Sequence, residues 1–395
     1  MAQKISVGID IGTSSIKVVV AESTSGGNSL PKIIGFGHAP SEGMRHGYIV
    51  DPSLVAVSLR KAIDQAQKTS GYKIEKAYFS IGGAGLEGAT NSASISLGEK
   101  ESVISQSELE AVVEACQEAL PASSSRNRDV IHSIPLSYKI DGKPVYGKAL
   151  GMTGNILEAK TLFITALTQH LGDLVAAAGI AEITIEDVDA SPIAASVPLL
   201  SKSQLMAGCG LLIIGAETSA FAVFENGAPS SATIFPIGSS DVTNDLALGF
   251  KVSLEEAERI KTSRPESLPY PRKKIEEIIR ARLEDIFDLV QAHLKKIGKA
   301  GLLPAGIMIT GGGAQNPYVE EIGKNILKLP AKKVGIKFEG EAKTALPNAI
   351  WAGAYGLSII GMSNGGEGRE SLHAILRRRG SFFRNMKKLF GKLLP

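Results

Sequence analysis

A short segment near the N-terminus recurs later in the chain, and this duplication constrains the fold more than any other feature. Residues 5–20, ISVGIDIGTSSIKVVV, indicate a strand, a tight turn and a second strand, with Gly12, Thr13 and Ser14 in the turn. A shift of 203 positions places residues 211–225, LLIIGAETSAFAVFE, over this hairpin. Similar hairpins in one chain predict two similar halves with a ligand held between them.

The first hairpin has the residues that a phosphate site needs. Small residues in its turn allow successive backbone N–H groups to converge on an anion. Lys17 adds a positive charge for a terminal phosphate, and Asp10 can hold Mg²⁺ through the water ligands of the ion. The sequence has no G-x-x-x-x-G-K-[ST] motif, so this is not a P-loop. Because ordinary hairpins also use such turns, the prediction rests on the hairpin together with its repeat.

The second hairpin carries less of this chemistry. Ile213 stands where the first copy has Asp10, and Ala220 stands where it has Lys17. Its turn consists of Gly215, Ala216, Glu217 and Thr218. We expect Glu217 to bring negative charge near the bound phosphates.

A third segment, residues 306–318, predicts a buried strand that ends in Gly311, Gly312 and Gly313. A helix is expected to follow, with Asn316 as its N-cap and Pro317 at its first position. Such a turn lets the backbone lie flat against a planar group such as a purine, and we include Gln315 in this base site.

A further helix is predicted to begin with the capping box Ser253–Glu256, and it carries Glu258 and Lys261. These two side chains can bind ribose hydroxyls. An ordinary exposed charge pair would have the same spacing, so both interpretations stay open.

The last fifteen residues, 381–395, predict an amphipathic helix that lies on an anionic membrane surface. The predicted membrane-facing set is Phe382, Phe383, Met386, Leu389, Phe390, Leu393 and Leu394, with Lys387 and Lys388 at the lipid headgroups. Residues 377–395 hold seven basic and no acidic residues, and without them the chain has more acidic than basic residues. Residues 361–368, GMSNGGEG, predict a flexible leash. A helix packed on the protein's own core is the alternative, and nucleic-acid binding is disfavoured because the body has no basic surplus.

Composition sets wider limits. The length of 395 residues predicts two or more domains, and 44% hydrophobic with 21% charged residues is typical of a soluble globular protein. No run of 18 apolar residues occurs, and the first residues lack the pattern of a secretory signal. Two distant cysteines predict neither a disulfide framework nor a metal site.

The two hairpins are followed along the chain by a strand, a glycine-rich turn and a helix. This order of elements resembles that of the actin-like ATPase superfamily. The sequence is similar to the FtsA family of bacterial cell-division proteins over essentially the whole chain. The runs that carry this similarity are residues 132–142 (HSIPLSYKIDG), 150–158, 235–247 and 256–261, together with the tail. The pilus-assembly relative PilM is the nearest alternative, and an actin-fold phosphotransferase is another.

The resemblance implies an α/β, actin-like (ribonuclease H-like, duplicated) fold with four subdomains and ATP with Mg²⁺ in the central cleft. The implied divisions are 1A at 1–80, 166–200 and 346–361; 1C at 81–165; 2A at 201–245 and 302–345; 2B at 246–301; a linker at 362–380; and the helix at 381–395. Subdomain 1C is expected to contain a helix over 107–120, and subdomain 2B a long helix over 273–297.

The resemblance also implies a function: tethering filaments of the tubulin-like protein FtsZ to the cytoplasmic side of the membrane at the division septum, with self-association into filaments. In the family, subdomain 2B receives the C-terminal peptide of FtsZ. Arg282 matches a basic position of that site, with Arg280 and Lys274 as neighbours, although these could be a solvated helix face.

The second hairpin departs from the superfamily pattern, in which the position of Ile213 carries an Asp that orients water. Ser191 falls roughly where related ATPases carry a Gln or Glu that positions water. We therefore expect ATP binding with weak or absent hydrolysis, and no residue is assigned a catalytic role.

Overall fold

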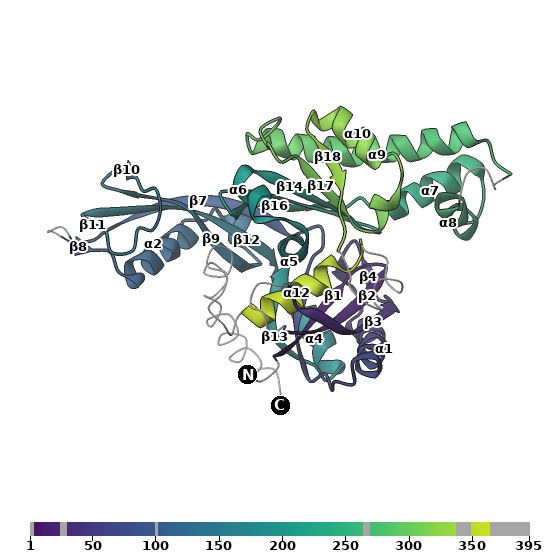
Figure 1. Ribbon diagram of the computed structural model, residues 1–395, viewed down its shortest axis with the longest axis horizontal. Helices are drawn as coiled ribbons and strands as arrows, with labels where there is room; N and C mark the ends of the chain where they lie inside the picture. Colours follow the sequence, from purple (N-terminus) through teal and green to yellow (C-terminus); the bar gives the residue numbers. More distant parts are fainter. Residues whose placement is uncertain (1–3, 24–29, 99–101, 264–268, 337–348, 364–395) are drawn as a thin grey trace.

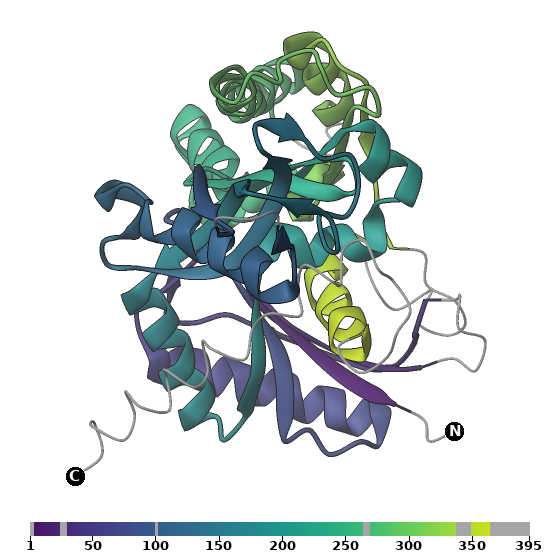
Figure 2. The ribbon, with the colours of Figure 1, turned by 90° about the vertical axis from the view of Figure 1, so that its left-hand side faces the viewer.

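The first hairpin forms the centre of a sheet in the order β13-β6-β1-β2-β3. This computed structural model describes residues 4–23, 30–98, 102–263, 269–336 and 349–363. Strand β2 is an almost continuous apolar run because helices cover both faces of the sheet, α12 and α5 on one and α1 and α4 on the other (Figures 1 and 2). We call this body the first lobe. Its elements are β1 (Ile5–Ile11), β2 (Ser15–Glu22), β3 (Lys32–Pro40), β4 (Met44–Arg45), β5 (Tyr48–Ile49), α1 (Pro52–Ser70), β6 (Lys76–Ile81), α4 (Thr168–Ile180), β13 (Thr184–Ala190), α5 (Ser191–Leu199) and α12 (Ala352–Ser363).

The second hairpin occupies the equivalent place in a second lobe. There the strand order is β16-β15-β14-β17-β18, and β14 and β17 run parallel. The helices of this lobe enclose an apolar core of their own around Phe221 and Phe287. Its elements are α6 (Lys202–Ala207), β14 (Cys209–Ile214), β15 (Ser219–Glu225), β16 (Ala228–Phe235), α7 (Ser239–Phe250), α8 (Leu254–Thr262), α9 (Arg272–Lys296), β17 (Ile307–Thr310), the 3₁₀ turn η2 (Gly312–Gln315), α10 (Val319–Leu327) and β18 (Ala331–Lys333).

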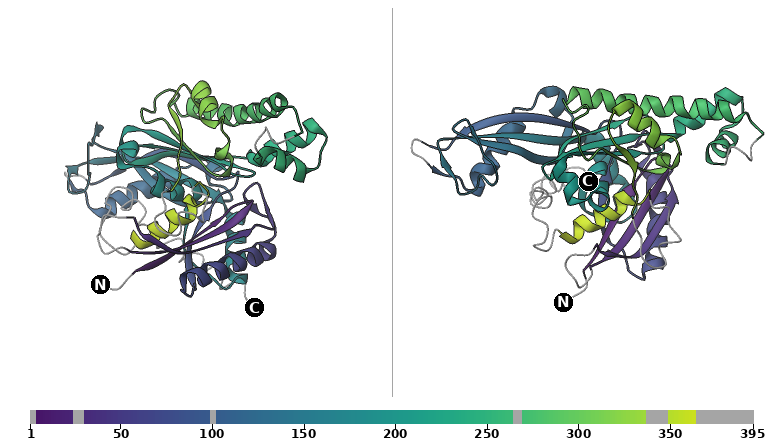
Figure 3. Two further views of the ribbon diagram at one scale, coloured as in Figure 1. Left: turned by 45° about the vertical axis from the view of Figure 1, so that its right-hand side comes forward. Right: turned by 45° about the horizontal axis from the view of Figure 1, so that its top comes forward.

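The chain between β6 and α4 forms an arm that projects from the body on the side opposite to α7 and α8 (Figures 1 and 3). The arm continues the sheet of the second lobe, because β7 pairs with β16 at Glu87 and Thr233. Helix α2 covers this sheet with a small apolar core that includes Cys116 and Phe163. Its elements are β7 (Glu87–Ser96), β8 (Ser102–Val103), α2 (Gln106–Glu118), α3 (Ala122–Ser125), β9 (Arg128–Ile140), β10 (Lys143–Pro144), β11 (Thr153–Gly154) and β12 (Ile156–Leu167).

The predicted duplication is confirmed at the level of strand register. Asp10 pairs with Lys17 across the first hairpin, and Ile213 pairs with Ala220 at the same place in the second. The polar pair and the apolar pair are therefore spatial equivalents, as well as equivalents in sequence.

The predicted helices are present with small shifts of their ends. The helix expected over 107–120 is α2, and its capping box is formed by Ser105 and Glu108. The helix expected over 273–297 is α9. Ser253 caps α8 by accepting the Glu256 N–H at 3.2 Å, but the Glu256 carboxylate accepts from Arg259 instead of completing the capping box.

Two predictions about the C-terminal third are wrong. Helix α10 begins at Val319, because Gly312–Gln315 form a 3₁₀ turn first, and the Asn316 side chain accepts the Tyr318 N–H at 3.0 Å instead of capping a helix. The leash expected over 361–368 is wrong for its first three residues, because Gly361–Ser363 belong to α12. Gly361 is there for close packing, since a Cβ would lie 2.2 Å from Ser6 Oγ.

Residues 364–395, which include the rest of the leash and the tail predicted to bind membrane, lie outside the described residues. Within the described part of the chain, no helix combines the length and the apolar content needed to cross a bilayer.

Helix α12 joins the first lobe through glycines at backbone contacts. A Cβ on Gly356 would lie 1.8 Å from the Ala194 carbonyl oxygen of α5. We predict that Gly356→Ala lowers the free energy of unfolding by about 1–3 kcal/mol, as overpacked cores do. The matched control is Gly172→Ala in α4, where a Cβ meets nothing within 4 Å, and there we expect a gain of up to about 1 kcal/mol. Urea unfolding measures both, and equal effects would contradict the close contact.

Candidate functional site

A cavity of about 840 Å³ lies between the lobes. This volume is within the range of roughly 300–1,000 Å³ that small-molecule sites occupy. Fourteen predicted site residues line it, namely Asp10, Gly12, Thr13, Ser14, Lys17, Gly215, Ala216, Thr218, Glu258, Lys261, Gly311, Gly312, Gly313 and Gln315. Segments more than 300 residues apart in sequence thus meet at one site.

Each hairpin turn is closed by the same hydrogen bond. Gly12 N–H donates to the Ser15 carbonyl at 3.2 Å, and Gly215 N–H donates to the Thr218 carbonyl at 2.8 Å. Within the described part of the chain, the N–H groups of the next residues, such as Thr13 and Ala216, have no acceptor. Backbone donors without partners at a cavity wall are suited to an anionic ligand.

The charged pair of the first hairpin lies at this wall. Lys17 is 8% exposed, its ammonium is 3.5 Å from the Asp10 carboxylate, and it donates to the Ser15 carbonyl at 3.1 Å. Ser80 Oγ donates to Asp10 at 2.7 Å, which fixes the orientation of the carboxylate. A buried cation must be paired, and Asp10 supplies the pairing without removing Lys17 from the cavity. Burial, and then the charge of Lys17, lower the pKa of the neighbouring His38.

Glu217 differs from the other predicted nucleotide-binding residues in the cavity that it lines. It does not line this cavity but a neighbouring one of about 790 Å³. Its carboxylate accepts the backbone N–H of His46 at 2.6 Å, from the hairpin β4–β5. The structure therefore holds the negative charge of Glu217 away from the turn donors.

The third turn, Gly311–Gly313, lies against the second hairpin. A Cβ on Gly311 would be 2.4 Å from the Ile214 carbonyl oxygen, and Gly311 has a φ of +96°, so glycine is required there on both grounds. Next to it, a Cβ on Gly312 would meet nothing within 4 Å, because the position faces open space. The turn therefore places backbone without side chains at the cavity wall.

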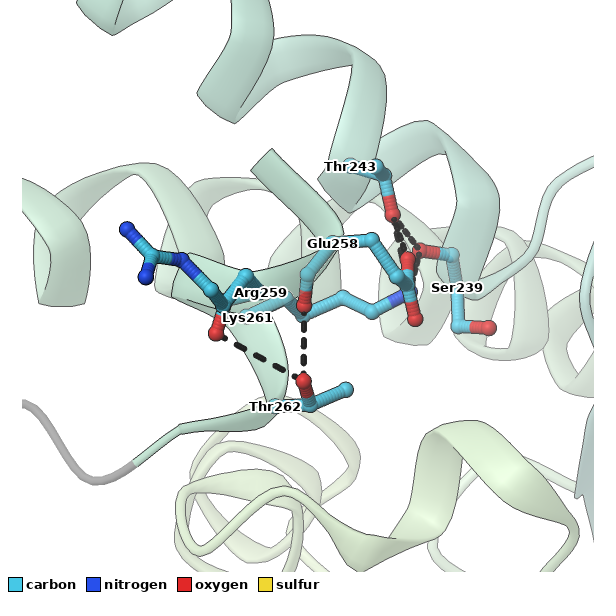
Figure 4. A network of polar contacts seen from close by, with 6 residues as sticks. All are labelled: Ser239, Thr243, Glu258, Arg259, Lys261 and Thr262. Carbon is cyan, nitrogen blue, oxygen red and sulfur yellow. Dashed lines mark hydrogen bonds and ion pairs between the residues drawn. The ribbon is translucent and has the colours of Figure 1, made fainter. Parts of the chain in front are cut away.

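Glu258 and Lys261 form one network (Figure 4). The Lys261 ammonium lies 2.7 Å from Glu258, donates to Thr243 Oγ1 at 2.8 Å and donates to the Ser239 carbonyl at 3.1 Å. Burial opposes ionisation of Glu258, but hydrogen bonds from Lys261 and Thr243 lower its pKa overall. The Glu258 side chain is 51% exposed, so it keeps acceptor capacity for a ligand hydroxyl.

Some lining residues were not predicted from the sequence. Gly47, Gly82 and Gly83 line the cavity beside the first turn, and Gly353 places the start of α12 against Asp10. Consecutive glycines after an apolar run, as at 82–83, are a sequence signal that could have been used. Ser191, which the sequence did single out, also lines the cavity, at the first residue of α5.

The basic residues predicted to bind a partner project from α9, and each has a partner within the chain. Arg282 makes a bidentate contact with Asp245 at 2.7 and 2.9 Å. Arg280 contacts Glu321 at 3.0 and 3.2 Å, and the Lys274 ammonium donates to the Gly249 carbonyl at 2.5 Å. They are therefore ordered by internal contacts.

Comparison with solved structures identifies the fold class. The PilM–PilN type IV pilus biogenesis complex contains a chain that matches with a TM-score of 0.67 and 17% identity, covering 90% of this chain and 98% of that one. MreB5 of Spiroplasma citri bound to ADP matches with a TM-score of 0.51 and 13% identity, covering 91% and 97%. The fold is the actin-like fold, as predicted.

Sequence comparison defines the family. The family model "Cell division protein FtsA" matches residues 211–356, and "SHS2 domain inserted in FTSA" matches residues 83–165. The cell division protein FtsA of Bacillus subtilis (strain 168) is 31% identical over 343 residues, covering 82% of this chain and 76% of that protein. That of Pseudomonas aeruginosa is 28% identical, covering 92% and 91%. The chain belongs to the FtsA family of cell division proteins.

Proposed function

We propose that this protein binds ATP with Mg²⁺ in the central cavity, tethers FtsZ filaments to the cytoplasmic face of the cell membrane, and self-associates at the division septum. The observation that carries the nucleotide part is that turns with N–H groups lacking an acceptor in the described part of the chain line the same cavity as Lys17. Family membership supports the role in cell division and favours it over pilus assembly. The tail supports the membrane part, through its amphipathic sequence alone.

The residues present fit a nucleoside triphosphate. The N–H donors of the hairpin turns and Lys17 would hold the phosphates. Glu258 and Lys261 would bind the ribose, and Gly311–Gly313 together with Gln315 would contact the base. A phosphate that pairs with Lys17 would leave Asp10 uncompensated, and a hydrated Mg²⁺ would restore the balance.

The same geometry argues for slow hydrolysis. Ile213 and Ala220 offer no polar atom at the place where the first hairpin has its charged pair. The Glu217 carboxylate accepts the His46 N–H and lines the neighbouring cavity, so in this arrangement it does not replace the missing carboxylate. Without a group that orients water, losses of about 10²–10⁴ in rate are typical.

We predict that the protein binds a fluorescent ATP analogue and that Lys17→Ala weakens binding at least about tenfold, or about 1.4 kcal/mol. Phosphate release with Mg²⁺ should stay near background. The matched control, Lys61→Ala on the exposed face of α1, should bind like the parent chain. Equal affinity for both variants, or rapid turnover, would contradict this assignment.

We predict that membrane attachment resides in the tail. Deleting residues 381–395 should leave a folded protein that no longer pellets with anionic vesicles, and Phe382→Glu with Phe390→Glu should act alike because charge on the apolar face opposes insertion. Each Lys or Arg near an anionic leaflet contributes about 1 kcal/mol, so pelleting should also weaken with salt. Pelleting that persists in the deleted chain would show another attachment.

We predict that Arg282→Glu weakens binding of a synthetic FtsZ C-terminal peptide about tenfold or more, because a like charge would face an acidic partner. The change also removes the contact with Asp245, so Asp245→Asn is the matched control. That control breaks the same ion pair but keeps the guanidinium, and it should bind at least as well as the parent chain. Calorimetry that finds equal losses would indicate a structural effect, and no loss in either would place the site elsewhere.

A further inference from the structure

The hairpin β4–β5 is a short connection with an unusual backbone at its tip. His46 and Gly47 both have positive φ, +46° and +77°, as the central residues of a type I′ turn do. A histidine with positive φ is uncommon, so its surroundings must hold it there. Those surroundings are the turns of both lobes and the base of the arm.

The hairpin tip contacts the turn of each lobe. Gly47 N–H donates to Thr13 Oγ1 in the first turn at 3.1 Å. His46 N–H donates to Glu217 Oε2 in the second turn at 2.6 Å, and the His46 ring nitrogen Nδ1 lies 3.5 Å from the Glu217 carbonyl oxygen. The tip therefore joins the lobes at the place where the phosphates are proposed to bind.

The other side of the same tip packs against the base of the arm. Ala84 N–H donates to the His46 carbonyl at 3.3 Å. Gly83 is so close that a Cβ there would lie 3.1 Å from the Gly47 carbonyl oxygen and 3.2 Å from the Tyr48 ring. Residues 83–86 lead directly into β7, so a displacement of the tip acts on the first strand of the arm.

The tip and the second turn also form a wall between cavities. Gly47 and Gly83 line the proposed nucleotide cavity, whereas His46 and Glu217 line the neighbouring cavity, and Glu258 lines both. The contact between His46 and Glu217 thus closes the wall and keeps a carboxylate out of the phosphate region.

We propose that phosphate binding at the turns of the two lobes restricts the motion of the arm through the hairpin Met44–Ile49. Glu217 is the positioning residue that holds this hairpin against the second lobe. The inference rests on the proposed nucleotide site. A phosphate near Thr13 and Ala216 disfavours any state in which Glu217 swings toward it, and so favours the contact with His46. Because the glycine contacts leave no free space, the tip cannot adjust without moving residues 83–86. By linkage, fixing the arm must in turn favour the nucleotide.

The test is hydrogen exchange of the full-length protein with and without saturating ATP and Mg²⁺. Three peptides matter: 10–15 reports the first turn, 43–50 the hairpin, and 83–88 the base of the arm. We expect nucleotide to slow exchange in all three, by about threefold or more at 83–88, because fewer opening fluctuations remain.

Variants separate the steps of this path. Glu217→Leu removes the acceptor for His46 N–H and should abolish the effect at 83–88 while 10–15 stays protected. Glu217→Gln keeps an acceptor oxygen and should restore it. Tyr48→Ala removes the ring against Gly83 without touching either turn, so protection should remain at 43–50 and disappear at 83–88. Glu284→Leu, on the exposed face of α9, is the control and should behave like the parent chain.

Each outcome is decisive. Protection at 10–15 without protection at 83–88 in the parent chain overturns the inference and leaves the nucleotide site standing. No protection at 10–15 refutes the nucleotide site and the inference together. Full protection at 83–88 in both Glu217→Leu and Tyr48→Ala would show that the arm is reached by another route.

Discussion

Backbone N–H groups that the hairpin turns leave without acceptors are the constraint on which the centre of this molecule depends. A turn closed by Gly12 or by Gly215 uses one donor internally, and the next residues, such as Thr13 and Ala216, line the cavity between the lobes. Such donors are costly when buried without a partner, so the turns stay at a cavity wall. The sheets behind them are covered on both faces, and this fixes where the cavity lies.

The duplicated halves keep one geometry but differ in chemistry. In the first, Asp10 and Lys17 face each other across the strands, and a buried ion pair requires well-ordered partners such as Ser80. In the second, the apolar side chains of Ile213 and Ala220 pack against the core and also line the cavity, so no charge there has to be desolvated. Of the two hairpins, only the first therefore carries charged side chains at the cavity, and on the second-lobe side the charges come from Glu258 and Lys261 of α8.

The sequence predicts most of the site because turn residues, strands and their repeat are local signals. Gly12, Gly215 and Gly311 lie in the expected turns and line one cavity for that reason. The contact between Glu217 and His46 could not be predicted, because it joins residues 171 positions apart through a backbone donor, which has no signature in a side-chain pattern. The start of α10 was misplaced because Gly312–Gln315 take up a 3₁₀ turn before the helix begins.

The attachment of the arm likewise depends on contacts between distant residues that the sequence does not predict. The helix over 107–120 and the insertion of the arm between β6 and α4 were expected from the sequence and the family resemblance, whereas no prediction was made for the individual strands of the arm. The sheet of the arm joins the sheet of the second lobe at Glu87 and Thr233, although the chain enters and leaves the arm through the first lobe. This junction could not be predicted from the sequence and is known only from the structure. Gly88 permits this junction, since a Cβ there would lie 3.1 Å from the Ala232 N–H nitrogen. The arm is consequently attached to the first lobe by two covalent connections, residues 83–86 and the junction of β12 with α4 at Leu167 and Thr168, and to the second lobe by strand pairing. A relative rotation of the lobes must therefore be accommodated at both connections.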